Sequence, residues 1–130
     1  MSENRIGKSI VQNSFSVGTD RILVRIGRSY RLLMIEDIQW VEAQGNYLRI
    51  HLKDDSVLVR YALCKIEEKL DSRLFARINR STIVRTDLIR ELRSIDGSGF
   101  RVVVNEDMSW KWGRRYRNNL DKLMANNRME

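Results

Sequence analysis

The chain of 130 residues is poor in the residues that build catalytic, metal or disulfide sites. Its only cysteine is Cys64 and its only histidine is His51. One cysteine excludes an intrachain disulfide framework, and a lone histidine lacks the further ligands that a metal site needs. There is no phosphate-binding glycine-rich loop and no carboxylate pair with a partnering base. We therefore expect no catalytic residue, no metal and no cofactor, with Cys64 an inert, at least half-buried thiol and His51 a surface or rim residue.

Long apolar runs are also missing from the chain. No run approaches the roughly 20 residues that a membrane-spanning helix needs, and residues 1–20 lack the pattern of a secretory signal. We expect no membrane insertion and, as the default without disulfides, a cytoplasmic location. The length and the 42 % hydrophobic content predict one folded domain.

Basic residues are plentiful and unevenly distributed. The chain holds 24 Lys+Arg against 17 Asp+Glu, a formal charge of +7. Residues 71–130 carry thirteen basic and eight acidic residues, and residues 111–119 carry four basic and no acidic ones. Such a patch is typical of a protein that binds a polyanion, although a charged face can also serve solubility alone. Charge does not distinguish DNA from RNA or an anionic membrane.

The apolar residues follow a two-residue period in most of the chain, which predicts strands joined by polar turns. We expect strands at residues 21–26, 30–35, 38–43, 47–52, 57–60, 88–95, 100–104 and 108–112. A helical period predicts an amphipathic helix at residues 61–70 and another that begins at Gly113. We divide the chain into a flexible lead or weak edge strand (1–20), a mainly β domain (21–125) and a polar tail (126–130).

The tripeptide Asn79-Arg80-Ser81 lies between two short apolar runs, where a turn at the surface is expected. Arg80 would there present a planar guanidinium with five donors, a geometry that suits phosphates and guanine edges. The alternative is an ordinary solvated turn.

A second basic group stands at the start of the terminal helix. Arg114, Arg115 and Arg117 crowd its first turn, where each cation opposes the helix dipole by roughly 0.3–1 kcal/mol. A bound phosphate would relieve this repulsion, and pairing with Glu106 or Asp107 is the alternative.

The order and spacing of these segments resemble the LytTR DNA-binding domain, which occurs mostly as the output half of bacterial response regulators. The resemblance covers residues 21–124, through IEDIQWVEAQGNYLRIHLKDD, EEKLD, LFARINRSTIVRTDLIREL and the final RRY. It implies an elongated stack of small antiparallel sheets with one short internal helix and a C-terminal helix. It also implies that loops, rather than a recognition helix, enter successive major grooves and bend the duplex.

The resemblance assigns base contacts to Asn46, to Arg80 and to Arg114 or Arg115. Residue chemistry adds predicted phosphate contacts at Arg77, Asn79, Ser81, Arg85, Lys111 and Arg117, with Arg114 also a candidate. Three positions depart from the family pattern: Asn79 stands for a usual His, Arg85 for Asn and Gly113 for Ser. These departures bear on the target sequence more than on the activity.

The sequence thus predicts a bacterial transcription regulator that binds double-stranded DNA sequence-specifically. From the resemblance we expect paired direct repeats as target, with a homodimer on DNA or a regulatory protein partner as possibilities. An RNA-binding module, or a basic domain that docks an acidic protein, remain alternatives. Residues 1–20 are too short for a receiver domain, so we expect no phosphorylation input within these 130 residues. The target sequence, and whether the protein activates or represses, stay open.

Overall fold

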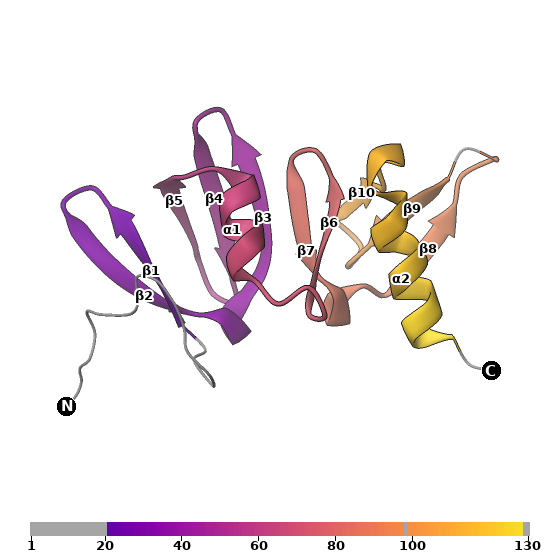
Figure 1. Cartoon of the computed structure of the whole chain (residues 1–130), viewed down its shortest axis with the longest axis horizontal. Coiled ribbons are helices and arrows are strands. Elements are labelled where there is room, and N and C mark those ends of the chain that lie inside the picture. Colours follow the sequence, from indigo (N-terminus) through magenta and orange to yellow (C-terminus); the bar gives the residue numbers. More distant parts are fainter. Residues whose placement is uncertain (1–20, 98, 129–130) are drawn as a thin grey trace.

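The structure is a computed structural model that describes residues 21–97 and 99–128. Ten strands in this part of the chain form three antiparallel sheets that follow one another along the long axis (Figure 1). The strands are β1 (Arg21–Ile26), β2 (Ser29–Met34), β3 (Ile38–Gln44), β4 (Tyr47–Leu52), β5 (Ser56–Arg60), β6 (Phe75–Asn79), β7 (Thr82–Arg85), β8 (Glu91–Ser94), β9 (Phe100–Val103) and β10 (Ser109–Lys111). The sheets are β1-β2, β5-β4-β3-β7-β6 and β10-β9-β8. The predicted stack of small antiparallel sheets is confirmed, while the predicted lead lies outside the described residues.

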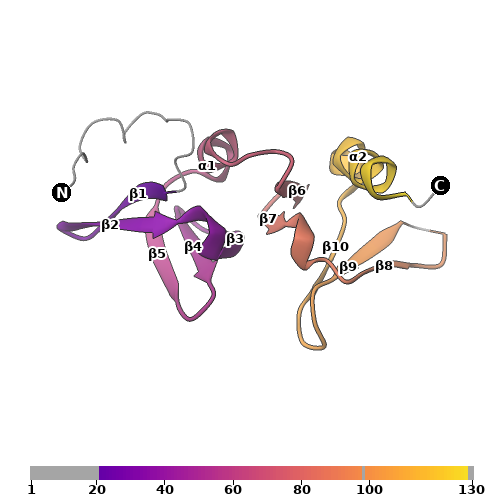
Figure 2. The ribbon, with the colours of Figure 1, turned by 90° about the horizontal axis from the view of Figure 1, so that it is seen from below.

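The two α-helices are α1 (Leu63–Lys69) and α2 (Arg117–Asn127), and both lie along the same side of the molecule, the upper one in Figure 2. Single 3-10 turns, η2 (Ile35–Asp37), η3 (Thr86–Leu88) and η4 (Arg114–Tyr116), join the elements. The predicted terminal helix therefore begins with a 3-10 turn, and its α-helical part starts only at Arg117. The strand predicted from residue 88 starts at Glu91 because η3 occupies the preceding residues. Helix α2 also extends into the segment that we predicted as a polar tail.

The central five-stranded sheet has an apolar cluster on each face. Neighbouring residues of a strand point to opposite faces, so Val41 joins one cluster and Trp40 the other. The first cluster packs β1, β2 and α1 on the sheet, and includes Leu33, Leu48, Ile50 and Ile66. The second packs β9, β10 and α2 on the opposite face, and includes Ile78, Val102, Trp112 and Leu120. Both terminal thirds of the described chain are thus held on the central sheet by buried apolar residues.

Four connections point toward the same edge of the molecule, the upper one in Figure 1. They are the β1–β2 turn, the β3–β4 turn, the β6–β7 turn and η4 before α2. In the β3–β4 hairpin, Gln44 pairs with Tyr47 and leaves Gly45 and Asn46 as a two-residue turn. Gly45 has a φ of +64°, the left-handed conformation that tight hairpin turns require. Asn46, Arg80 and the η4 arginines therefore belong to one edge.

Candidate nucleic-acid interface

The β6–β7 turn is held in shape by the side chain of Asn79. Its Oδ1 accepts hydrogen bonds from the backbone N–H of Ser81 at 2.9 Å and from the Ser81 hydroxyl at 3.2 Å. This is the local bonding by which asparagine stabilises a turn two residues on. Its Nδ2 donates to the carbonyl of Lys111 at 3.3 Å. The amide that we expected at a phosphate thus orders the backbone around Arg80.

Arg77 supports the same turn from β6. Its guanidinium donates to the carbonyls of Asn79 at 3.1 Å and Arg80 at 2.7 Å, and to Glu67 Oε1 at 2.8 Å. It also lies over the ring of Tyr116, with 5.2 Å between the guanidinium carbon and the ring centroid. Only 11 % of the Arg77 side chain is exposed, so little of it is left for a phosphate.

Backbone hydrogen bonds join the β6–β7 turn to the loops on both sides. The N–H of Ala43, near the end of β3, donates to the carbonyl of Ser81 at 2.9 Å. On the other side the N–H of Gly113 donates to the carbonyl of Ile78 at 2.7 Å. A Cβ on Gly113 would meet the Cβ of Asn79 at 3.3 Å, so the approach is close. The three loops that carry the predicted base contacts are therefore bonded into one unit.

The predicted base-contacting side chains at this edge have no partners among the residues that the structure describes. Within residues 21–97 and 99–128, no hydrogen bond or ion pair is made by the side chains of Asn46, Arg80, Arg114, Arg115 or Lys111, all of them exposed. Ser81 is also exposed, with its hydroxyl bonded to Asn79. The donors of these side chains face solvent from a framework that is itself hydrogen-bonded.

Arg85 lies elsewhere, on the opposite end of β7. Its Nε donates to the carbonyl of Ile38 at 2.8 Å and its Nη2 to the carbonyl of Ile35, while the guanidinium carbon lies 4.9 Å from the centroid of the Phe75 ring. Its side chain is 11 % exposed. Arg85 therefore does not lie at the edge that carries Arg80. Most of the guanidinium donors that we predicted to bind a phosphate are bonded within the protein.

A scan against family models matches residues 23–125 to the LytTr DNA-binding domain. The chain belongs to the LytTr DNA-binding domain family. A search of solved structures finds the LytTr DNA-binding domain of a Bacillus cereus protein described as a methyl-accepting/DNA response regulator, with a TM-score of 0.69. The match covers 82 % of this chain and 98 % of the other, at 18 % identity, and it supports the fold.

Curated relatives of this LytTr domain are longer proteins. "Sensory transduction protein LytT" of Bacillus subtilis (strain 168) is 26 % identical over 123 residues, which is 92 % of this chain and 51 % of that protein. "Heme-containing CO-sensing transcriptional regulator RcoM 1" of Paraburkholderia xenovorans (strain LB400) is 36 % identical over 67 residues, 52 % of this chain and 25 % of that protein. The chain spans about half the length of the first and a quarter of the second.

The N-terminus of helix α2 in this LytTr domain differs from the prediction. Arg114 and Arg115 lie in η4, and only Arg117 belongs to the first turn of α2. Arg117 pairs with Asp121 at 3.1 Å, one helical turn on. In the part of the chain that the structure describes, neither Glu106 nor Asp107 forms an ion pair with them. The first turn of α2 carries no acidic residue.

An aromatic and polar group connects the central sheet to the C-terminal one. Glu42 approaches His51 Nε2 at 3.0 Å and accepts a hydrogen bond from Trp110 Nε1 at 3.4 Å. Trp40 stacks on His51 with 4.4 Å between ring centroids and meets Trp110 edge-on at 5.4 Å. His51, predicted to be a surface or rim residue, is half-buried in this group. Cys64, predicted to be at least half-buried, is instead exposed on α1.

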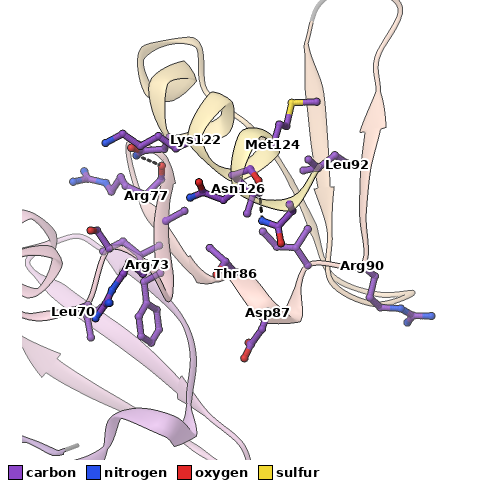
Figure 3. A pocket seen from close by; sticks show the side chains of 18 of the residues that line it. Leu70, Arg73, Arg77, Thr86, Asp87, Arg90, Leu92, Lys122, Met124 and Asn126 are labelled. Carbon is purple, nitrogen blue, oxygen red and sulfur yellow. Dashed lines mark hydrogen bonds between the residues drawn. The ribbon is translucent and has the colours of Figure 1, made fainter. Parts of the chain in front are cut away.

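A groove of about 870 Å³ lies away from the three loops, between the α1–β6 connection and α2 (Figure 3). Apolar residues such as Phe75 and Leu123 line it together with charged ones such as Arg90 and Lys122. Beside it, hydrogen bonds from the side chain and backbone of Arg73 lower the pKa of the Asp71 carboxyl. The groove mixes both signs of charge and does not gather the predicted base-contacting residues.

Two further features are absent from residues 21–97 and 99–128. No group of three or more His, Cys, Asp or Glu side chains there could hold a metal ion. Neither helix of these ranges is long and apolar enough to cross a membrane.

Proposed function

We propose that this LytTr domain binds double-stranded DNA sequence-specifically through the three bonded loops, as part of a bacterial transcription regulator in the cytoplasm. DNA binding as such follows from membership of a DNA-binding family. The proposal adds which residues read the bases. It rests on one observation above all. Asn46, Arg80, Arg114 and Arg115 are exposed and have no side-chain partner among the described residues, and hydrogen bonds join their loops at one edge.

The chemistry of the free side chains fits base edges in the major groove. Arg80 and Arg115 can each donate two hydrogen bonds to O6 and N7 of a guanine, and Asn46 can pair with N6 and N7 of an adenine. Each such pair contributes roughly 1–3 kcal/mol of discrimination. Rigid support matters because a side chain presented by a fixed backbone loses less entropy on binding. Asn79 and Arg77 supply that support for Arg80.

Phosphate contacts would fix the register of the protein on the duplex. Lys111, Arg114, Arg117 and Ser81 are exposed and close in the chain to the base-contacting positions. We leave Arg77 and Arg85 out of this set because their guanidinium groups bond to backbone carbonyls. Loops spread along the molecule can reach separate grooves if the duplex bends, at a cost of about 1–6 kcal/mol for a short site.

Two substitutions separate base reading from phosphate binding. Arg80→Ala keeps the turn, since Arg77 bonds to the carbonyl of residue 80 and not to its side chain. We expect it to reduce the affinity difference between the target duplex and a duplex with one changed base pair. Arg117→Ala should weaken binding to all duplexes and lower the slope of log K against log salt by about 0.9. Equal losses on all sequences from both variants would contradict this division.

Partners follow from the same proposal. We expect paired direct repeats as target, with two copies of the domain on one site, and a regulatory input from a partner protein or from a further domain such as the longer relatives contain. Size-exclusion chromatography with light scattering on duplexes that carry one or two motif copies tests the stoichiometry. A preference for single-stranded RNA, or for an acidic protein over any nucleic acid, would replace the proposal with one of the two alternatives.

A further inference from the structure

The β1–β2 hairpin has the same local construction as the β3–β4 hairpin that carries Asn46. In β1–β2, Ile26 pairs with Ser29 and leaves Gly27 and Arg28 as a two-residue turn. Gly27 has a φ of +63°, against +64° for the first turn residue of the other hairpin. In both turns a glycine in the left-handed conformation stands first and a polar side chain stands second. Arg28 is therefore presented in the same way as Asn46.

Both hairpins also carry, near the turn, an exposed tyrosine that lies beside an arginine. Tyr30 lies across from Arg25, whose guanidinium carbon is 5.9 Å from the centroid of the tyrosine ring. Tyr47 lies across from Arg60, which belongs to the neighbouring strand β5, with the same 5.9 Å separation. The two tyrosines are 62 % and 42 % exposed, among the most exposed large apolar side chains in the described ranges. Each turn is thus flanked by a stacked arginine and tyrosine that leave cationic and apolar surface in solvent.

Arg28 is a cation without a side-chain partner in the described part of the chain, on the edge that we assign to DNA. It is exposed, and within the described ranges its side chain makes no hydrogen bond or ion pair. Arg25, by contrast, donates to the carbonyl of Gly27 at 3.1 Å and so steadies the turn. The β1–β2 turn points to the same edge as the three loops, but it lies at the far end of the molecule and lower than the β3–β4 turn (Figure 1).

We propose that the β1–β2 turn is a fourth contact with DNA, in which Arg28 binds a backbone phosphate in the flank of the target beyond the groove that Asn46 enters. This inference rests on the proposed function. Because the turn lies lower than the β3–β4 turn, a straight duplex would pass above it. The flank reaches Arg28 when the duplex curves around the β3–β4 turn. A phosphate contact does not depend on the base sequence directly. Its strength depends instead on how easily the flank bends toward Arg28.

The test compares Arg28→Ala with Arg90→Ala. Arg90 is also exposed and without a side-chain partner in the described ranges, and it lies beside the groove and points away from it (Figure 3). Both variants lose one positive charge. Each protein is titrated with a duplex that carries the selected motif and about ten base pairs on each side, at several salt concentrations. The titrations are repeated after one flank is trimmed back to the motif. Urea unfolding verifies that both variants stay folded.

The proposal expects Arg28→Ala to lower the slope of log K against log salt by about 0.9, whereas Arg90→Ala leaves it unchanged. Between 50 and 200 mM salt, wild type should then lose roughly 3.5-fold more affinity than Arg28→Ala. Trimming one flank should weaken wild type and leave Arg28→Ala unaffected. A wild-type slope and flank dependence in Arg28→Ala, or equal effects of both variants, would overturn this proposal alone. Absence of any preferred motif in wild type would overturn it together with the proposed function.

Discussion

Replacing Arg85 tests whether this arginine stabilises the fold or binds DNA, because the two roles predict different effects on stability and on DNA binding. Its guanidinium donates to the carbonyls of Ile38 and Ile35 and stacks on Phe75, with Asp87 at 4.0 Å. Arg85→Ala removes all of these interactions at a position that is mostly buried. It also removes a clamp between β7 and the η2 turn that precedes β3.

The expected loss follows from these contacts. A hydrogen bond from a charged donor contributes about 1.5–3 kcal/mol, and a cation over an aromatic ring about 0.5–2 kcal/mol. The carbonyl of Ile35 also accepts the N–H of Ile38, so it does not become unpaired when Arg85 is removed. We therefore take the lower end and expect Arg85→Ala to reduce the free energy of unfolding by about 3 kcal/mol.

Urea unfolding measures this loss as a fall of roughly 1–3 M in the midpoint, for the slopes typical of small domains. DNA titrations under conditions where the variant is folded should give the wild-type salt slope. Arg117→Ala is the matched opposite, since its exposed pair with Asp121 contributes only about 0.3–0.5 kcal/mol. An Arg85→Ala protein with wild-type stability and a salt slope lower by about 1 would refute the internal role and support the phosphate contact predicted from sequence.

Three further substitutions test the framework of the loops. Asn79→Ala should lower the free energy of unfolding by about 1 kcal/mol, since it removes partly exposed hydrogen bonds, and should also weaken target binding. A urea midpoint and a target affinity both equal to those of wild type would contradict the role of Asn79 in ordering the turn. Gly113→Val should lower the free energy of unfolding by about 1–2 kcal/mol, because the valine side chain would crowd Asn79. An unchanged melting temperature in calorimetry would show that the backbone at residue 113 does not approach Asn79 closely. Tyr47→Ala should leave duplex specificity intact in a binding assay with mismatched duplexes, whereas a collapse of binding with the fold retained would favour a reader of single strands that stacks bases on aromatics.

Most strands could be predicted from the sequence because their two faces meet different surroundings. Residues 47–52 alternate between apolar and polar side chains, and β4 has these bounds, with Leu48, Ile50 and Leu52 buried. Residues 21–26 likewise form β1. The mixed pattern at residues 88–95 was less informative, because a 3-10 turn there is followed by a short strand that is half-buried at Leu92 and otherwise exposed.

The roles of individual arginines could not be predicted in the same way. Arg77, Arg80 and Arg85 lie within one basic stretch, yet only Arg80 is free of internal bonds among these three. The difference depends on partners remote in sequence, such as Glu67 and the carbonyl of Ile38. Local pattern also missed the bonding of His51 to Glu42, since that contact depends on the register of β3 against β4.

Selection of random duplex DNA at near-physiological salt tests the central claim most directly, with wild type, Arg80→Ala and Arg90→Ala in parallel. The account predicts that wild type enriches a short repeated motif and that Arg90→Ala enriches the same motif. Arg80→Ala should bind with one or two positions of the motif no longer preferred. No enriched motif in wild type, or the same motif with unchanged preferences in Arg80→Ala, would contradict base reading by this loop.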